Sequence, residues 1–189
     1  MAHSNNSLVT GKFSGTLGKE IVFREWDGKT VVAKAPKRRK GKQTPEQAET
    51  QEKFLIASLY ARGVVRNPDK SMATAYEAVL KPRQNVYSRA LEDYISPPVV
   101  KSINTRNYKG KAGDKIVGLA IDDFRVVSVR VEIYAANGTL LEEGNAELSF
   151  NGVDFSYTAT QANTMLAGSK IRAIATDVPA NEGMLEVTL

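Results

Sequence analysis

The sequence predicts an α+β first part, made of a β-hairpin and three short helices, followed by an all-β immunoglobulin-like sandwich. Apolar residues recur at helical spacing between residues 45 and 94, whereas from about residue 100 onward they alternate as in strands. Two adjacent prolines, Pro97 and Pro98, lie where the pattern changes. We therefore expect three segments: a flexible arm at 1–12, a hairpin-helical domain at 13–98 with a basic tract at 34–42, and the sandwich at 99–189.

The hairpin follows a polar start, "MAHSNNSLVTGK", for which we expect no order of its own. The segments "EIVFREW" (20–26) and "KTVVAKA" (29–35) have the composition of strands. Asp27 and Gly28 form the turn between them, because both residues tolerate the positive φ that tight hairpins need. Since an isolated hairpin is only marginally stable, it needs another element to pack against.

Three helices follow the hairpin. Thr44 is a favourable N-cap, Pro45 suits the first helical position and Gln47 completes a capping-box pattern. These residues predict a helix from Pro45 to about Arg62, ending before Gly63. Two later apolar stripes at the same spacing predict shorter helices, at 72–80 and 86–94, each stopped by proline.

The second half shows only strand patterns. Val127, Val129, Val131 and Ile133 alternate with polar residues, which predicts a half-buried antiparallel strand. The dipeptide Asn137-Gly138 is a strong hairpin signal. About seven short strands in the last ninety residues are typical of an immunoglobulin-like sandwich. The chain has no cysteine and its single tryptophan lies in the hairpin, so the resemblance to antibody domains is limited to architecture.

The residue types argue against an enzyme. Without cysteine there is no thiolate nucleophile or cysteine zinc site, and the single histidine, His3, lies in the polar arm. Neighbouring carboxylates occur at Asp122-Asp123 and Glu142-Glu143, but adjacent residues point to opposite faces, so we expect solvated turn residues. No glycine-rich phosphate-binding motif is flanked by a strand and a helix. We therefore expect no catalytic, cofactor-binding or metal-binding residues.

Charge is distributed unevenly along the chain. The net charge of +5 divides into +7 for residues 1–100 and −2 for residues 101–189. The tract from Lys34 to Lys42 holds six positive charges and no negative one. It is compatible with a protein-docking surface, with phosphate binding assisted by aromatic stacking, or with a solvated linker. The residues that we expect to bind a partner are Phe23, Trp26, Lys37, Arg38, Arg39 and Lys40.

The segment "GKFSGTLGKEIVFREWDGKTVVAKAPKRRKGKQTPEQAETQEKF" resembles the start of a family of small uncharacterised bacterial and phage-associated proteins. Their pattern is "GxxSGxxGxxVF", a hairpin carrying "GK.VVR.KP", a "TxxQ" helix start and a later aromatic residue. It is matched by Gly11, Ser14, Gly15, Gly18, Val22, Phe23, Gly28, Lys29, Val31, Val32, Lys34, Pro36, Thr44, Gln47 and Phe54. The family's usual Asn-Pro-Arg before the helix is replaced here by "KGKQ".

Residues 114–189 resemble a β-sandwich module that follows such segments, through "EIYAANGTLLEEGNA", "FSYTAT" and "GSKIRAIATDVPANEG". Together, the two resemblances imply a structural component or cargo of a phage or of a phage-tail-like contractile injection particle.

The sequence therefore predicts a non-enzymatic assembly protein that docks through its basic N-terminal half onto a protein partner, or onto further copies of itself in a larger assembly. Two other functions stay open: a nucleic-acid-binding protein with a sandwich for oligomerisation, and an adhesive or effector protein. No apolar run approaches the length of a membrane span and no signal peptide is visible. We expect synthesis in the cytoplasm, followed by incorporation into a virion or a phage-tail-like particle.

Overall fold

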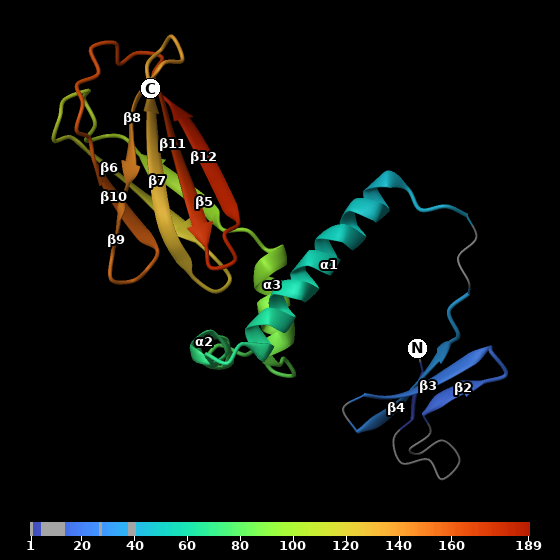
Figure 1. The fold of residues 1–189 in the computed structure, drawn as a ribbon. Coiled ribbons are helices and arrows are strands. Elements are labelled where there is room, and N and C mark those ends of the chain that lie inside the picture. Colours follow the sequence, from blue (N-terminus) through green and yellow to red (C-terminus); the bar gives the residue numbers. More distant parts are fainter. Residues whose placement is uncertain (1, 5–13, 27, 38–40) are drawn as a thin grey trace. The chain divides into compact units, whose positions relative to one another are not determined.

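The chain forms a mixed α+β structure with a large β part, as expected from the sequence. The computed structural model describes residues 2–4, 14–26, 28–37 and 41–189 (Figure 1). These residues form two compact units, Met1–Thr44 and Pro45–Leu189. The first unit holds one four-stranded antiparallel sheet, and the second holds three helices and two further antiparallel sheets.

The sheet of the first unit has the strand order β1-β4-β3-β2. Its central hairpin confirms the prediction, and Gly28 has the positive φ of +69° that the turn requires. The strands are β1 (Ala2–Ser4), β2 (Gly15–Leu17), β3 (Ile21–Trp26) and β4 (Lys29–Lys34).

One short strand lies in the segment that we expected to be a flexible arm. Ala2–Ser4 pairs with Thr30–Val32 of β4, so the order of these residues comes from the sheet that holds them. An edge strand presents unpaired N–H and C=O groups, and a polar segment can satisfy them regardless of its side chains. The rest of the expected arm, residue 1 and residues 5–12, lies outside the described residues.

The three predicted helices are confirmed as α1 (Pro45–Arg66), α2 (Ser71–Glu77) and α3 (Val86–Ile95). α1 continues past Gly63, where we expected it to end. The reason is tertiary: Val64 is buried in a small apolar core with Ala61, Tyr76 and Ala90, and this burial outweighs the cost of about 1 kcal/mol for a helical glycine.

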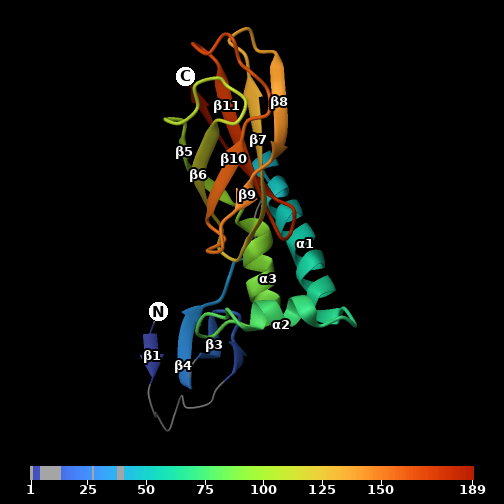
Figure 2. The ribbon, with the colours of Figure 1, turned by 90° about the vertical axis from the view of Figure 1, so that its left-hand side faces the viewer.

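Two four-stranded antiparallel sheets make up the rest of the second unit and are called the two-sheet part. Their strand orders are β5-β6-β10-β9 and β12-β11-β7-β8. Figures 1 and 2 show the sheets face to face, and one core of buried residues joins them. The strands are β5 (Val99–Asn104), β6 (Lys115–Ile121), β7 (Val126–Tyr134), β8 (Leu140–Asn145), β9 (Glu147–Leu148), β10 (Asp154–Thr158), β11 (Lys170–Asp177) and β12 (Glu182–Thr188).

The predicted alternation along β7 holds except at its start and at Glu132, which is buried although it lies among the outward-facing polar residues. Val129, Val131 and Ile133 are completely buried, as expected, but Val127 is about half exposed, at 52%. The pairing of β7 with β11 shifts here, so that Val126 opposes Asp177 and Val127 is the extra residue. Val126 therefore takes the inward position that the alternation assigned to Val127.

The helices belong with the two-sheet part. The buried Arg89 of α3 donates a hydrogen bond to the backbone carbonyl of Asp123, in the loop after β6. The ring of Tyr76 in α2 stacks on Phe124 of the same loop, with 4.3 Å between centroids. The boundary between the compact units falls after Thr44 in the chain, whereas we expected one at residue 98.

Candidate docking surface of the basic sheet

The register of the first sheet decides which side chains share a face. Leu17 pairs with Ile21, which pairs with Lys34, and Phe23 pairs with Val32. Paired residues lie on the same side of a sheet, and residues two apart along a strand share that side. The residues on one face, called the Phe23 face, are therefore Leu17, Ile21, Phe23, Glu25, Thr30, Val32 and Lys34.

Trp26 lies on the opposite face. It is three residues from Phe23 along β3 and pairs with Lys29 of β4. An odd separation along a strand reverses the side, so the structure does not bring the two predicted aromatic residues together. Trp26 is 64% exposed at the end of its strand, next to a lysine rather than beside Phe23.

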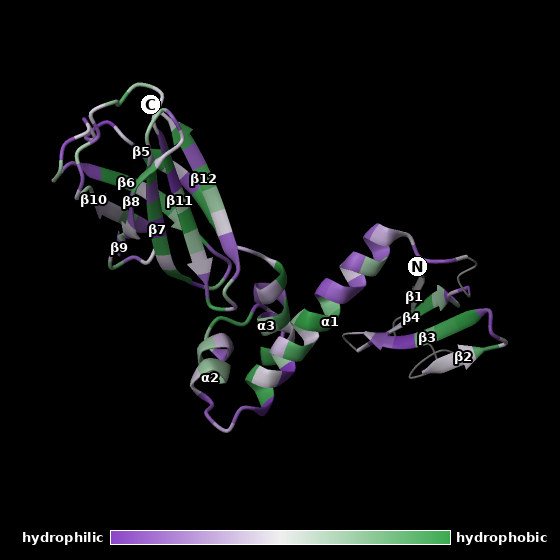
Figure 3. Ribbon diagram, turned by 45° about the horizontal axis from the view of Figure 1, so that its top comes forward, coloured by the Kyte–Doolittle hydropathy of each residue, from purple (hydrophilic) through white to green (hydrophobic). Residues whose placement is uncertain are grey.

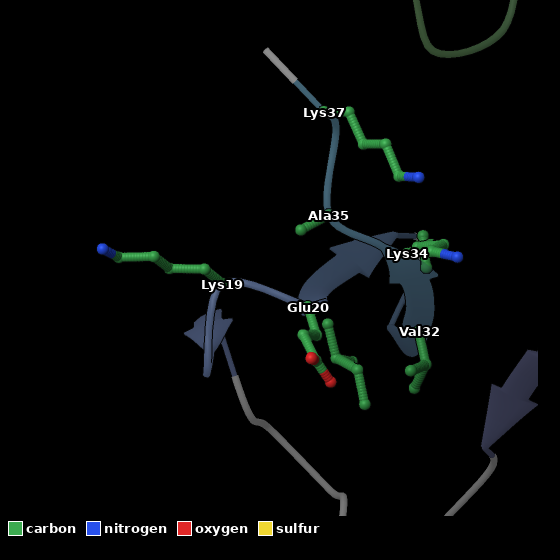
Figure 4. A pocket seen from close by; sticks show the side chains of 8 residues that line it. Lys19, Glu20, Val32, Lys34, Ala35 and Lys37 are labelled. Carbon is green, nitrogen blue, oxygen red and sulfur yellow. The ribbon is translucent and has the colours of Figure 1, made fainter.

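A groove of about 800 Å³ lies at one end of the Phe23 face. Figure 4 shows Lys34 and Lys37 on one side of this groove and Lys19 on the other, with the carboxyl of Glu20 between them. Three cations against one carboxylate give the groove a positive balance. It is lined by Lys19, Glu20, Ile21, Val32, Ala33, Lys34, Ala35 and Lys37.

The predicted basic tract is only partly described. Lys37 is exposed and lines the groove, and its role in docking stays a prediction. Arg38, Arg39 and Lys40 lie outside the described residues, so their part in the surface stays a prediction. Lys19 and Lys34 were missed as site residues, although the hairpin register would have placed Lys34 beside Ile21.

The positive charge of the chain is concentrated in this unit. Residues 1–44 contain ten Lys and Arg against three Asp and Glu, a net charge of +7, and residues 45–189 carry the remaining −2. Within the unit, no helix or second sheet of described residues covers either face, and among residues 14–26, 28–37 and 41–44 only Thr30 and Val31 are buried. The Phe23 face is therefore largely apolar and belongs to the positively charged unit, with Lys19, Lys34 and Lys37 at the groove.

The neighbouring carboxylates noted in the sequence have structural roles. Asp122 accepts hydrogen bonds from the backbone N–H groups of Phe124 and Arg125, at 2.8 and 2.9 Å, and so fixes the loop after β6. Glu142 was expected to be a solvated turn residue, and this is wrong. It is buried in β8 and accepts from the backbone N–H and the hydroxyl of Thr160, at 2.8 and 2.6 Å.

A polar cluster that we did not expect from the sequence joins α1, α2 and α3. The Tyr76 hydroxyl donates to Asp93 at 2.6 Å, and the Tyr60 hydroxyl lies 2.9 Å from that of Tyr76. Burial raises the pKa of Asp93 to about 6, and the nearby Asp122 and Asp177 carboxylates add to this increase. The sequence signal for this cluster was Asp93, a charged residue at helical spacing from the apolar residues of α3. An aspartate in such a position is more often solvated than buried.

Among the described residues, no three His, Cys, Asp or Glu side chains are grouped so that they could hold a metal ion. No helix in that part of the chain is long and apolar enough to cross a membrane.

Comparison with models of protein families finds none that matches this chain, and comparison with curated proteins finds no similar sequence. The resemblance to phage-associated proteins therefore stays a prediction, and the geometry of the basic sheet is the main guide to function.

Proposed function

We propose that this chain is a non-enzymatic assembly protein, which docks through the Phe23 face of its basic sheet onto an acidic surface of a protein partner. The observation that carries the proposal is a sheet with a largely apolar face that no second layer of described residues covers, next to a groove lined by Lys19, Lys34 and Lys37. A stable sheet normally buries one face against another layer. A partner that covers this face supplies the missing layer.

The apolar residues would anchor such a complex. Leu17 is 64% exposed and Ile21 is 38% exposed, while Phe23 and Val32 are half-buried between them. Burial of apolar surface contributes about 25 cal/mol per Å², and a few central residues usually dominate the binding energy. Lys19, which would lie at the rim, would mainly accelerate association with an acidic surface and make it sensitive to salt.

We propose further that the two-sheet part is an immunoglobulin-like sandwich, and the strand orders support this. Immunoglobulin-like domains place strands A, B, E and D in one sheet and G, F and C in the other, often with an added C′. Naming β5 to β12 as A, B, C, C′, D, E, F and G reproduces both observed orders, β5-β6-β10-β9 and β12-β11-β7-β8. Such a domain offers loops and sheet faces for contacts within an assembly.

The proposed setting is a phage or a phage-tail-like contractile injection particle, with the chain made in the cytoplasm and then incorporated as a component or cargo. Its support is the sequence resemblance alone. An acidic, repetitive protein surface in such a particle would fit the charge of the first unit.

The docking proposal can be tested with synthetic acidic polymers. We expect the full chain to bind poly(Glu,Tyr), which is both acidic and aromatic, more tightly than poly-Glu or a DNA oligonucleotide of equal charge. Leu17→Ser/Phe23→Ser should remove the preference for poly(Glu,Tyr), and Lys19→Gln/Lys34→Gln should weaken binding to every probe. Trp26→Ser on the opposite face is the matched control and should leave the preference unchanged.

The order of affinities decides between the functions. Tighter binding to DNA than to poly(Glu,Tyr) would overturn the docking proposal and favour the nucleic-acid alternative. Loss of the preference in the Trp26 variant, but not in the Leu17/Phe23 variant, would show that the opposite face is the interface.

A further inference from the structure

The solvent-exposed side of α1 carries residues at a regular spacing, and these residues do not pack against α2 or α3. Starting at Ala48, the residues on this side are spaced four, three, four, three and four apart, which is the spacing of a coiled-coil seam. At its centre, Leu55 and Leu59 are each 57% exposed. All members of this seam are exposed: Ala48, Glu52, Leu55, Leu59, Arg62 and Arg66.

The seam lies opposite the face that packs on the other helices. Ala57, Ala61 and Val64 are buried and face α2 and α3. A helix turns by about 100° per residue, so Ala57 and Val64 lie about half a turn away from Leu55 and Leu59. Figure 3 shows the first turns of α1 as hydrophilic and its later turns as largely hydrophobic. Leu55 and Leu59 of the seam therefore lie outside the core of the three helices and stay exposed.

The charges of the seam are arranged symmetrically about its centre. Glu52 lies three residues before Leu55, and Arg62 lies three residues after Leu59. If a second α1 runs in the opposite direction, Leu55 of each copy meets Leu59 of the other, and Glu52 meets Arg62 twice. In the described part of the chain, neither Glu52 nor Arg62 takes part in an ion pair.

We propose that the α1 seam is a homodimer interface, in which two copies of this chain pair their α1 helices antiparallel around Leu55 and Leu59. Parallel pairing would place Glu52 against Glu52 and Arg62 against Arg62, which is unfavourable at both positions. The order of charges and leucines along the seam is complementary to the same order read in the opposite direction. A second copy of α1 explains this symmetry, whereas an unrelated partner would not. The pairing goes beyond the docking of the basic sheet and does not rest on it.

Charge exchange tests the pairing. Wild-type protein should dimerise by sedimentation equilibrium at chain concentrations up to about 1 mM, a range that reaches weak interfaces. Glu52→Arg and Arg62→Glu should each weaken the dimer by about 10- to 30-fold, because either change creates like charges at both symmetric contacts. The double variant Glu52→Arg/Arg62→Glu should restore the dimer, and an equimolar mixture of the two single variants should form a heterodimer.

Two further variants separate the seam from other surfaces. Leu55→Ser/Leu59→Ser should abolish the dimer without loss of helix content, because both leucines are exposed in the isolated chain. Glu46→Arg makes the same change of charge on α1 as Glu52→Arg, but away from the seam, and should leave dimerisation unchanged.

The direction of pairing can be measured with one spin label, because the chain has no cysteine of its own. In the antiparallel pair, Ala48 lies opposite Arg66, so labels at Ala48→Cys should be about 27 Å apart along the axis, from eighteen residues at 1.5 Å each. Parallel pairing would bring the labels to about 10 Å. A short distance, a monomeric wild-type chain, or a dimer that survives Leu55→Ser/Leu59→Ser would each overturn the proposal.

Discussion

The buried carboxyl of Asp93 predicts an unusual dependence of stability on pH. Asp93 is completely buried, and its pKa is raised from 3.8 to about 6, first by burial and then by the Asp122 and Asp177 carboxylates. The hydrogen bond from Tyr76 and the charge of Arg89 act in the opposite direction, but they do not cancel the cost of burial. The folded chain therefore holds a proton here more tightly than the unfolded chain does.

The direction and size of the pH effect on stability follow from the difference in the pKa of Asp93 between the folded and the unfolded chain. Tighter proton binding in the folded state stabilises it at low pH, and this stabilisation is lost as the pH rises from about 4 through about 6. A difference of about two pKa units corresponds to about 3 kcal/mol. The pKa of Asp177 is also raised by burial and acts in the same direction. Glu92, with its pKa lowered to about 2, acts oppositely but only below pH 4.5.

Substitution Asp93→Asn should remove most of this pH dependence, because an amide cannot ionise and its oxygen still accepts from Tyr76. We expect urea unfolding, followed by circular dichroism of the helices, to show a wild-type chain less stable at pH 7.5 than at pH 5. The Asn variant should show a much smaller difference. Asp123→Asn, an exposed carboxyl next in the chain to Asp122, is the control. Equal wild-type stability at both values, or an unchanged slope in the Asp93 variant, would refute the reasoning.

Three further substitutions test the packing of the second unit by thermal unfolding. Gly183→Ala should cost several kcal/mol, since its Cβ would overlap the backbone carbonyl of Pro98, and normal stability would contradict this packing. Gly63→Ala should stabilise the chain by about 0.5–1 kcal/mol, because this helical glycine has open space around it; a loss would indicate a contact at this position. Asn85→Ala should cost about 1 kcal/mol by removing the capping box with Ser88, whereas no change would show that the cap contributes nothing.

Local signals in the sequence predicted the helices and the hairpin well. The start of α1 depends on Pro45 and its neighbours, and the turn at Gly28 depends on backbone freedom, so neither needs distant contacts. Opposite faces for Phe23 and Trp26 were also predictable, because three residues along a strand always reverse the side. The strand alternation therefore already separated Phe23 from Trp26, although both are near each other in the chain.

Other features depend on tertiary contacts and could not be read locally. The shift that buries Val126 instead of Val127 is set by the pairing with β11. The burial of Glu142 depends on Thr160, which lies in a loop after another strand. Ala2–Ser4 pairs because β4 has a free edge, and a three-residue polar strand carries no pattern of its own. The candidate docking surface needed both the strand register and the groove.

Two polar side chains that link the helices to the two-sheet part, the buried Arg89 and the partly buried Asn181, also bear on the order of events during folding. Arg89 of α3 reaches a loop between two strands, and the amide of Asn181 donates to the Tyr94 carbonyl at 3.1 Å across 87 positions of chain. Contacts that bridge such separations form late, whereas the helical turns themselves are local. We expect these side chains to keep their hydration in the transition state, so that changes at Arg89 accelerate unfolding and leave the refolding rate nearly unchanged.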